Sequence, residues 1–349
     1  MFGTYKPEDV TILLKDITGL VEPMNTRERE ARIQQGIHYC EMLPMEYQPS
    51  PAYLAAYRDA LERYASTTAL AAARVAEEIW RDKGPDGVLV SLARAGTSIG
   101  VLLKRYIALR HRVSLPHYTI SIIRGRGIDR AAMAYLLKQY RPEQLQFVDG
   151  WTGKGAIQRE LDRAMADCPG VDPGLAVLSD PGGLAGKRGT REDFLIASSC
   201  LNSTVSGLLS RTFLRSDIIG PGEFHGAAFY RELLDQDLTY GFIDTVADRF
   251  PEKAEPEEEP AFSCTAEEEV AEICRTFGIE DRNLVKPGIG EATRVLLRRM
   301  PWKLLVHSLE DRARLGHLYR LAEEKGVPLE VYPLQHYLAC GLIQKLADS

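Results

Sequence analysis

The chain has 349 residues, of which 45% are hydrophobic and 26% are charged, and its net charge is −6. This length predicts two or three domains, and the acidic balance argues against a protein whose whole surface binds nucleic acid or membranes. No apolar run reaches the roughly 18 residues that span a membrane, and the start of the chain has no secretory signal. Six cysteines are scattered without any zinc-binding spacing, so we expect reduced thiols and a cytoplasmic protein with no membrane partner.

The first 250 residues predict an α/β fold. Residues 52–82 carry apolar side chains at three- and four-residue steps, as in a long helix. Continuous apolar runs then predict buried parallel strands at 87–93, Tyr118–Ile123, Leu145–Val148 and Gly174–Ser179. Helices are predicted between them at Ser98–Leu109, 130–140 and 156–166. We therefore expect a parallel sheet with helical N-terminal additions, whose ligand site lies where the strands end.

A second domain follows a linker. The stretch Phe250–Ala261, FPEKAEPEEEPA, is too rich in proline and glutamate to pack a core, so we place a solvated linker at 251–264. It separates a domain at 1–250 from one at 265–349. In the latter, helices at Ala266–Phe277 and 311–325 and strands at Leu304–His307 and Leu329–Tyr332 predict a small three-layer α/β domain.

The sharpest motif is FVDGWTGKGAIQREL, in which a strand runs through a glycine-rich turn into a helix. Backbone N–H groups in such a turn form an anion-binding nest with the helix N-terminus. Thr152 adds a hydroxyl donor and Lys154 a positive charge, while Asp149 suits a ribose hydroxyl or a metal-bound water. The candidate residues of this turn are Asp149, Gly150, Thr152, Gly153, Lys154 and Gly155.

Two further strand ends carry candidate anion sites. After the first strand, the small residues Ala95, Gly96 and Thr97 let the backbone approach an anion, and Arg94 can pair with phosphate oxygens. After the second strand, Arg124 and Arg126 lie between glycines in a cationic loop. Both patterns also occur in ordinary turns.

The VDGWTGKGA turn resembles the phosphoribosyl-pyrophosphate motif of type I phosphoribosyltransferases. The resemblance implies that this turn holds a 5-phosphate, that Asp149 handles ribose and Mg²⁺, and that Arg94, Arg124 and Arg126 hold pyrophosphate. Asp149, Arg124 and Arg126 would then be the catalytic residues of a phosphoribosyltransferase. It would use phosphoribosyl pyrophosphate, or bind a phosphoribosyl nucleotide, with an acceptor that the sequence does not identify. The family usually has a second acidic residue where this chain has Gly150.

A longer series of motifs resembles the StiP family over nearly all of residues 3–349. It comprises YKPEDVTILLKDI, IHYCEMLPMEYQPS, PHYTISIIRGRGID, FVDGWTGKG, GTREDFLIASSCLNSTVSGLLSRT and EFHGAAFYRELLDQDLT. That family is encoded beside tellurite-resistance and stress-response genes. It is described as phosphoribosyltransferase-like and also labelled a cysteine protease.

Two alternatives to group transfer stay open. One is a thiol hydrolase in which Cys200, just before a helix-like stretch, is the nucleophile and His117 or His225 the base. A packed, unreactive Cys200 is the simpler interpretation. The other is a non-catalytic sensor that binds a phosphoribosyl nucleotide and signals through the C-terminal domain.

The C-terminal turn from Gly288 to Arg294 resembles the Pelota-like module that binds bent RNA. The resemblance implies a structured RNA partner, contacted by Lys286, Gly288, Gly290, Glu291 and Arg294. The family usually has asparagine where this chain has Gly290. The oligomeric state stays open, with a homodimer as one alternative.

Overall fold

A computed structural model describes residues 2–343, apart from the side chains of Thr26, Glu30 and Gln34. Within these residues a seven-stranded sheet has the order β1-β4-β3-β6-β7-β8, with β5 paired to β4. Every pairing along this path is parallel, and only β5 is antiparallel. The strands are β1 (Thr11–Ile12), β3 (Val88–Ala93), β4 (His117–Ile123), β5 (Gly127–Ile128), β6 (Leu145–Val148), β7 (Ala176–Ser179) and β8 (Lys187–Thr190).

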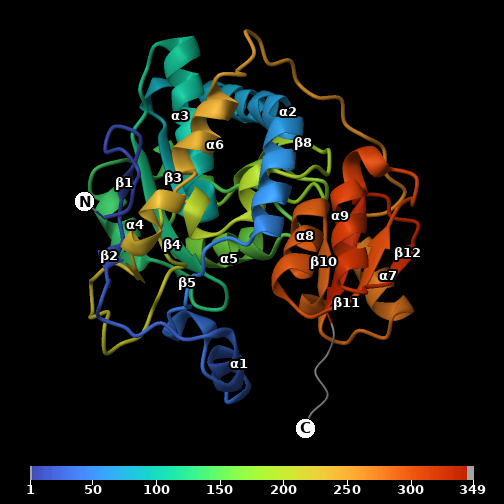
Figure 1. The fold of residues 1–349 in the computed structure, drawn as a ribbon. Helices are drawn as coiled ribbons and strands as arrows, with labels where there is room; N and C mark the ends of the chain where they lie inside the picture. Colours follow the sequence, from blue (N-terminus) through green and yellow to red (C-terminus); the bar gives the residue numbers. More distant parts are fainter. Residues whose placement is uncertain (1, 344–349) are drawn as a thin grey trace.

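Helices cover both faces of this sheet (Figure 1). One face packs against α2 (Pro51–Lys83), α3 (Ala95–His111) and α6 (Thr239–Ala247), and the opposite face packs against α4 (Arg130–Leu137) and α5 (Ala156–Met165). Alternate residues of β3 divide between the two cores, with Leu89 on one side and Val88 and Val90 on the other. The predicted α/β class with a parallel sheet is confirmed.

Two of the differences between the observed and the predicted helices and strands lie at the start of α3 and at strand β8. The long helix predicted at 52–82 is α2, capped by Ser50. Helix α3 begins at Ala95 rather than Ser98, because the chain passes from β3 directly into a helical turn. Strand β8 was missed because its sequence, KRGT, has no apolar run. Its pairing with β7 makes it a strand.

The C-terminal domain has its own four-stranded sheet, in the order β10-β13-β11-β12. Only the β11–β12 pair is parallel. The strands are β10 (Val285–Pro287), β11 (Pro301–Val306), β12 (Leu329–Val331) and β13 (Ala339–Ile343), and the helices are α7 (Ala266–Thr276), α8 (Ile289–Arg298) and α9 (Arg312–Glu324). Residues 344–349 of the expected domain lie outside the described residues.

Residues 251–264 form no helix or strand and arch over the molecule between α6 and α7 (Figure 1). The stretch is mostly exposed, as expected of a linker, but it is also held in place. The Glu257 carboxylate accepts from the Arg191 backbone N–H at 2.6 Å, and the Glu255 carbonyl accepts from Arg74 Nε at 2.8 Å. Glu257 also pairs with Arg74, and Glu259 pairs with Arg188 and Arg191, so the acidic side chains lie against arginines in and beside β8.

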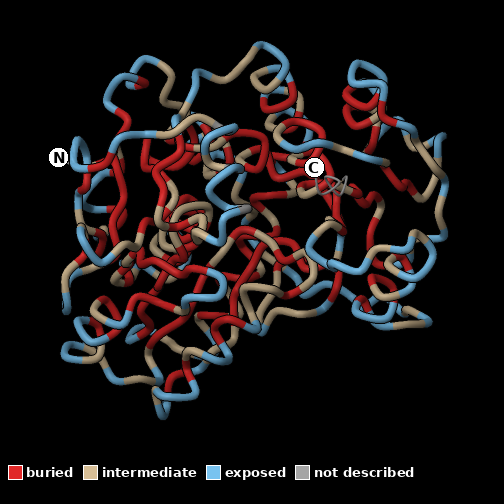
Figure 2. The backbone as a smooth tube through the Cα atoms, turned by 90° about the horizontal axis from the view of Figure 1, so that it is seen from below, coloured by how far each residue is buried: buried red, intermediate tan, exposed pale blue. Residues whose placement is uncertain are grey.

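The two domains share a buried core. One hydrophobic cluster joins Ala197 and Cys200 of the 3₁₀ turn η4 (Ala197–Cys200) to Ile289, Ala292 and Leu296 of α8. Figure 2 shows buried backbone in both domains, with exposed segments at the turns. The remaining elements are α1 (Thr26–Gln34), which projects at the bottom of the view in Figure 1, and the small sheet of β2 (Lys15–Asp16) and β9 (Gly226–Ala227). No described helix is long and apolar enough to cross a membrane.

Candidate functional site

The carboxyl ends of β4, β3 and β6 lie side by side, because these strands are consecutive in the parallel sheet. Each end continues into a segment predicted to bind phosphate, namely 94–97, 124–127 and 149–155. Ligands of open α/β sheets bind at such an edge. We call it the strand edge.

Segment 94–97 is the first turn of α3 rather than a free loop. Gly96 is required by packing, since a Cβ there would lie 2.5 Å from the carbonyl oxygen of Val148. Thr97 is buried, and its hydroxyl hydrogen-bonds Thr119 Oγ1 at 2.8 Å. Arg94 remains partly exposed and donates from Nη1 to the carbonyl of Leu209 at 2.7 Å. Of this segment, the guanidinium of Arg94 is the group best placed to meet a ligand.

Segment 149–155 is largely engaged by the protein itself. Thr152 donates its hydroxyl to Asp180 Oδ1, and its N–H donates to the carbonyl of Ser179 at 3.0 Å. Asp149 accepts from the N–H of Gly150 at 2.8 Å. Burial raises the pKa of Asp149 to about 6, although that hydrogen bond and Arg294 oppose the rise. Asp149 is thus a carboxyl group that titrates close to neutral pH.

Lys154 faces the C-terminal domain. Its Nζ donates to the carbonyl oxygens of Arg282 and, at 3.1 Å, of Val285. Burial, reinforced by the charges of Lys286 and Arg124, lowers the pKa of Lys154 to about 8. The lysine predicted to hold a phosphate therefore joins the two domains.

The loop of Arg124 and Arg126 is fixed by a carboxylate that sequence reasoning missed. Both oxygens of buried Glu160 on α5 accept backbone N–H bonds, from Gly125 at 2.9 Å and from Gly127 at 3.1 Å. Arg126 pairs with Glu41 at 2.8 Å. The sequence signal that could have identified Glu160 was its place as the fifth residue of the helix that follows the glycine-rich turn.

The C-terminal domain covers the strand edge. Asp193, which sequence reasoning also missed, accepts from the N–H groups of Ile289, at 2.9 and 3.1 Å, and Leu338, at 2.8 Å. Burial raises the pKa of Asp193 to about 7, against the lowering effect of these hydrogen bonds. The sequence signal that could have identified Asp193 was its place directly before the apolar run FLIA. The turn predicted to read RNA is therefore pinned to the large domain.

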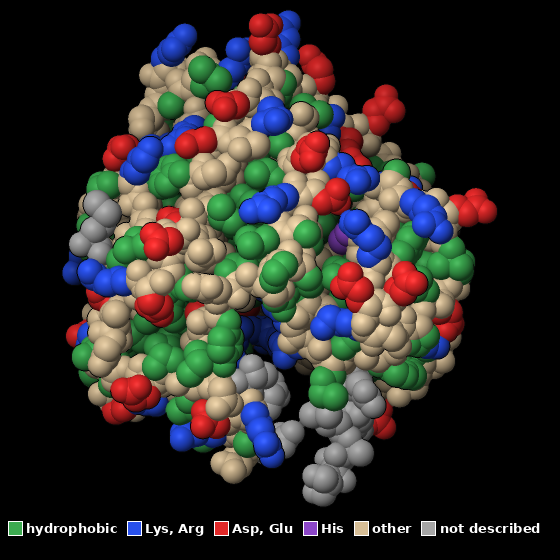
Figure 3. All heavy atoms as spheres, in the orientation of Figure 1, with side chains coloured by type: hydrophobic (Ala, Val, Ile, Leu, Met, Phe, Trp, Pro, Cys, Tyr) green, Lys and Arg blue, Asp and Glu red, His purple; other side chains and the backbone are tan. Residues whose placement is uncertain are grey.

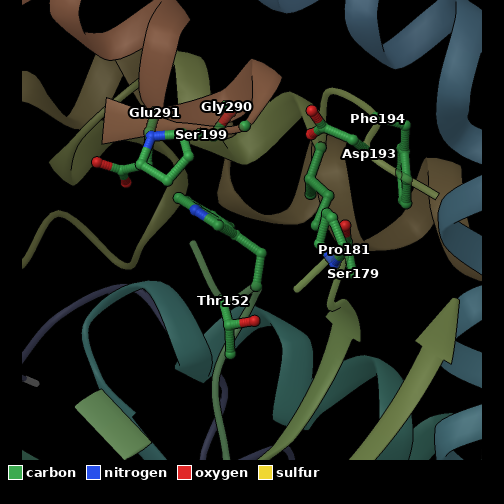
Figure 4. A pocket seen from close by; sticks show the side chains of 12 residues that line it. Thr152, Ser179, Pro181, Asp193, Phe194, Ser199, Gly290 and Glu291 are labelled. Carbon is green, nitrogen blue, oxygen red and sulfur yellow. The ribbon is translucent and has the colours of Figure 1, made fainter. Parts of the chain in front are cut away.

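Little space remains between the two predicted sites. A cavity of about 10 Å³ is bounded by Thr152, Asp193, Ser199, Gly290 and Glu291, among others. Figure 4 shows Glu291 and Gly290 on one side of it, and Asp193 on another. That volume is close to the minimum for one water molecule. A larger ligand at this point requires the domains to separate.

Arginines from both domains gather beside the covered edge. We call them the arginine cluster: Arg94, Arg211, Arg294, Arg298 and Arg299. The charges of Arg29, Arg94 and Arg299 lower the pKa of Arg211. The charges of Arg294 and Arg94 lower the pKa of Arg298. Figure 3 shows basic side chains inside the hollow between the domains. Arg94 and Arg294 were predicted from the sequence, and the adjacent pair Arg298-Arg299 was the available signal for two others.

Two arginines of the cluster, Arg211 and Arg298, have no carboxylate partner among the described residues. Burial, and then neighbouring arginines, lower the pKa of Arg211 to about 10 and that of Arg298 to about 9. Arg298 donates to Asn202 Oδ1 at 2.7 Å and to the carbonyl of Cys200 at 2.8 Å, whereas Arg211 lies over the Tyr39 ring. Neither has a carboxylate within ion-pair distance in the described part of the chain. Both side chains are half-buried, and cations withdrawn from water are ordinarily paired, so this arrangement suits an anion.

The residues fit Mg²⁺ poorly on their own. Among the described residues no group of three or more histidine, cysteine, aspartate or glutamate side chains is arranged to hold a metal ion. Asp149 has one carboxylate of like charge nearby, that of Glu291. Protein Mg²⁺ sites of this kind depend on phosphates of the ligand.

Cys200 is inaccessible. Its exposed fraction is 0%, and burial raises the pKa of its thiol to about 12 despite the opposing charge of Arg298. The histidines proposed as bases have other partners: His117 Nε2 contacts Ser91 Oγ at 2.8 Å and His225 Nδ1 contacts Ser121 Oγ at 2.8 Å. The structure does not bring them to Cys200.

A different thiol lies next to a histidine. His38 Nδ1 is 2.9 Å from Cys40 Sγ, a pair that sequence reasoning did not consider. Cys40 is 1% exposed, and burial raises its pKa to about 11. All six cysteines are free, and burial also raises the pKa of Cys264, Cys274 and Cys340. None of these four pKa shifts, nor that of Cys200, favours a thiolate.

The fold and the strand edge define a two-domain α/β protein with a cationic site beneath its C-terminal domain. The profile of the family described as "Tellurite-like stress resistance cysteine protease StiP" matches residues 3–247, and that of the "PELOTA RNA binding domain" matches residues 264–345. The chain is 34% identical to "Cysteine protease StiP" of Acinetobacter baylyi, over 99% of this chain and 95% of the relative. The chain belongs to the StiP family, as its motifs predicted.

The comparisons correct one prediction. We expected a phosphoribosyltransferase, but the relative is named a cysteine protease, so that enzyme class is wrong. The chain also resembles a xanthine-guanine-hypoxanthine phosphoribosyltransferase of Helicobacter pylori, with 16% identity over 39% of this chain and 77% of that one. The TM-score of 0.25 is too low to support any argument about activity.

Proposed function

We propose that the protein binds a phosphorylated small molecule at the strand edge and couples its binding to RNA through the C-terminal domain. The observation that carries this proposal is the arginine cluster, in which Arg211 and Arg298 are desolvated without carboxylate partners. A ligand with one or two phosphates would supply the missing negative charge, and hydrogen bonds between charged partners are the strongest of their kind. The cluster includes Arg94, at the carboxyl end of β3.

The ligand we favour is a phosphoribosyl nucleotide or phosphoribosyl pyrophosphate, bound without transfer of the ribose. Support comes from the polar groups at the strand edge, where the Asp149 carboxyl lies within reach of the charge of Arg294. A sugar hydroxyl can donate to that carboxylate while phosphates meet the arginines. Mg²⁺ would bind only together with the ligand, held by Asp149 and the phosphate oxygens.

RNA is the proposed partner of the C-terminal domain, on the strength of its family profile. In the closed arrangement, the turn with Gly288 and Gly290 is buried against the large domain. We propose that this turn and α8 move away from the strand edge when they meet RNA, while the domains stay in contact where Lys154 meets the carbonyls of Arg282 and Val285. The free cysteines also agree with a reducing, cytoplasmic location.

A thiol hydrolase is the second candidate, because the Acinetobacter baylyi relative is named a cysteine protease. Cys200 lies under α8, with Arg298 and Arg294 as the nearest charges that lower its pKa. Separation of the domains would hydrate this thiol next to two guanidinium groups, which favour a thiolate. Hydrolysis of a casein substrate that Cys200→Ser abolishes would establish this activity; equal hydrolysis by both proteins would exclude Cys200 as the nucleophile.

Calorimetric titration with phosphoribosyl pyrophosphate, with and without Mg²⁺, tests the leading proposal. We expect saturable binding that Arg211→Gln weakens about 10- to 100-fold, the usual effect of losing one hydrogen bond to a charged group. Arg130→Gln is the matched control, because Arg130 is an exposed arginine on α4 whose side chain is 83% accessible. The proposal fails if the wild-type protein does not bind, or if both variants bind equally well.

A further inference from the structure

A second cationic site lies outside the arginine cluster. A cavity of about 220 Å³ opens between the two domains, and we call it the basic groove. Its walls come from the loop after β4, the start of α5 and the C-terminal domain. The lining residues are Arg124, Lys154, Ala156, Arg159, Arg163, Glu267, Arg282 and Asn283. It shares no residue with the arginine cluster.

The basic groove has more positive than negative charge. Arg163 pairs with Glu160 at 3.0 Å, and Arg282 pairs with Glu267 at 3.2 Å. The other three cations, Arg124, Lys154 and Arg159, have no carboxylate within ion-pair distance in the described residues. Arg124 donates to the amide oxygen of Asn283 at 3.3 Å, and Lys154 donates to backbone carbonyls, so neither charge is neutralised.

The backbone at the start of α5 adds to the positive electrostatic potential of the basic groove. Ala156 is the first residue of α5, and its N-cap is Gly155 in the left-handed conformation, with φ of 71°. The cap has no side chain to satisfy the first N–H groups of the helix, which carry the positive end of the helix dipole. The positive end of α5 therefore faces the groove lined by arginines.

The dimensions favour a polymer backbone over a buried small molecule. Pockets for small ligands usually enclose about 300–1,000 Å³, with apolar and aromatic walls, whereas this groove holds about 220 Å³ and has no aromatic lining residue. Arg159 and Arg163 are exposed, and the side chain of Arg163 is 70% accessible. Such a site offers contacts to phosphates but no surface on which a base can stack.

We infer that the basic groove binds the phosphodiester backbone of RNA, so that the RNA footprint extends from the C-terminal domain onto α5 and the loop of Arg124. This inference rests on the proposed RNA binding, since Arg282 and Asn283 belong to the segment with the RNA-binding profile. The contacts are to phosphates and therefore independent of sequence. The N-terminal domain thereby takes part in RNA binding.

The test measures binding of the full chain to a fluorescein-labelled RNA hairpin with an asymmetric internal loop, by anisotropy at several salt concentrations. We expect Arg159→Gln/Arg163→Gln to weaken binding about 10-fold and to reduce the salt-dependence slope by roughly one to two. The control is Arg110→Gln/Arg130→Gln, which removes the same charge from exposed positions elsewhere. It should leave the slope close to that of the wild-type protein.

The outcomes separate this inference from the proposed function. If the wild-type protein binds no RNA, the proposed partner itself is wrong. If it binds RNA, and both double variants give the wild-type affinity and slope, the groove is not part of the footprint. A calorimetric titration with pyrophosphate tests whether the groove binds a small anion instead. If Arg159→Gln/Arg163→Gln loses pyrophosphate binding but keeps the wild-type RNA affinity, the groove binds a small anion and the RNA assignment is wrong.

Discussion

Tyr337 of the C-terminal domain donates its hydroxyl to the carbonyl oxygen of Gly153, at 2.8 Å. Gly153 belongs to the glycine-rich turn after β6, so one hydrogen bond joins the segment predicted to hold phosphate to the domain predicted to bind RNA. The Tyr337 side chain is fully buried. Two sites that look independent in the sequence therefore cover one another in the folded chain.

Tyr337→Phe should loosen the closed arrangement. It removes the hydroxyl and keeps the ring, and loss of one such bond costs about 1 kcal/mol, or roughly a fivefold shift toward the open form. Peptide-resolved labelling of Cys200 with a thiol reagent should accelerate by that factor. Tyr47→Phe, at an exposed tyrosine, is the control. Unchanged labelling would mean that Cys200 does not become accessible by domain separation.

The phosphorylated ligand and RNA should oppose each other. Arg294 lies beside Asp149 in the closed arrangement and also belongs to the predicted RNA turn, so the two ligands need different domain positions. Saturating phosphoribosyl pyrophosphate should raise the dissociation constant for RNA about 5- to 150-fold, and RNA should weaken the small ligand by the same factor. Arg211→Gln should require about 10- to 100-fold more phosphoribosyl pyrophosphate to produce the same effect. Simultaneous binding without mutual influence would contradict this coupling.

Stability should fall with rising pH because of Asp193. Its pKa is raised from 3.8 to about 7 by burial, so the folded state favours the protonated carboxyl. The protonated Asp193 carboxyl adds to the free energy of unfolding. This contribution is complete below the pKa that Asp193 has in the unfolded chain, and it is lost as the pH rises toward about 7. The melting temperature of the wild-type protein should therefore decline from pH 5 to pH 8 more steeply than that of Asp193→Asn. Parallel profiles for the two proteins would contradict this role.

Arg211→Gln should stabilise the protein without ligand. The native fold holds this guanidinium where burial and other arginines lower its pKa to about 10, which disfavours the charged form. Removing the charge should raise stability by about 1 kcal/mol, at the expense of binding, as is common for residues retained for function. Differential scanning calorimetry at pH 7 measures the change. A clear loss of stability would show that Arg211 supports the fold instead.

Local sequence determined much of the large domain. The apolar runs around Val90, Ile122 and Phe147 form buried strands because such runs lose too much free energy when exposed. The glycine-rich turn after β6 follows from the same local rules, since Gly155 adopts a left-handed conformation before α5. The composition of residues 251–264 predicted a linker, and these residues form no helix or strand. Strand KRGT was not, because only its pairing with β7 makes it a strand.

Only the tertiary structure decided what the motifs contact. The sequence offered Lys154 as a phosphate ligand, but its Nζ reaches carbonyls more than 120 residues away, at Arg282 and Val285. It offered Cys200 as a nucleophile, but packing under α8 buries the thiol. Arg94 and Arg211 come together within the fold of the large domain, and Arg298 meets Arg94 only where the C-terminal domain docks. Burial and long-range charge depend on which segments pack together, and no local pattern encodes that.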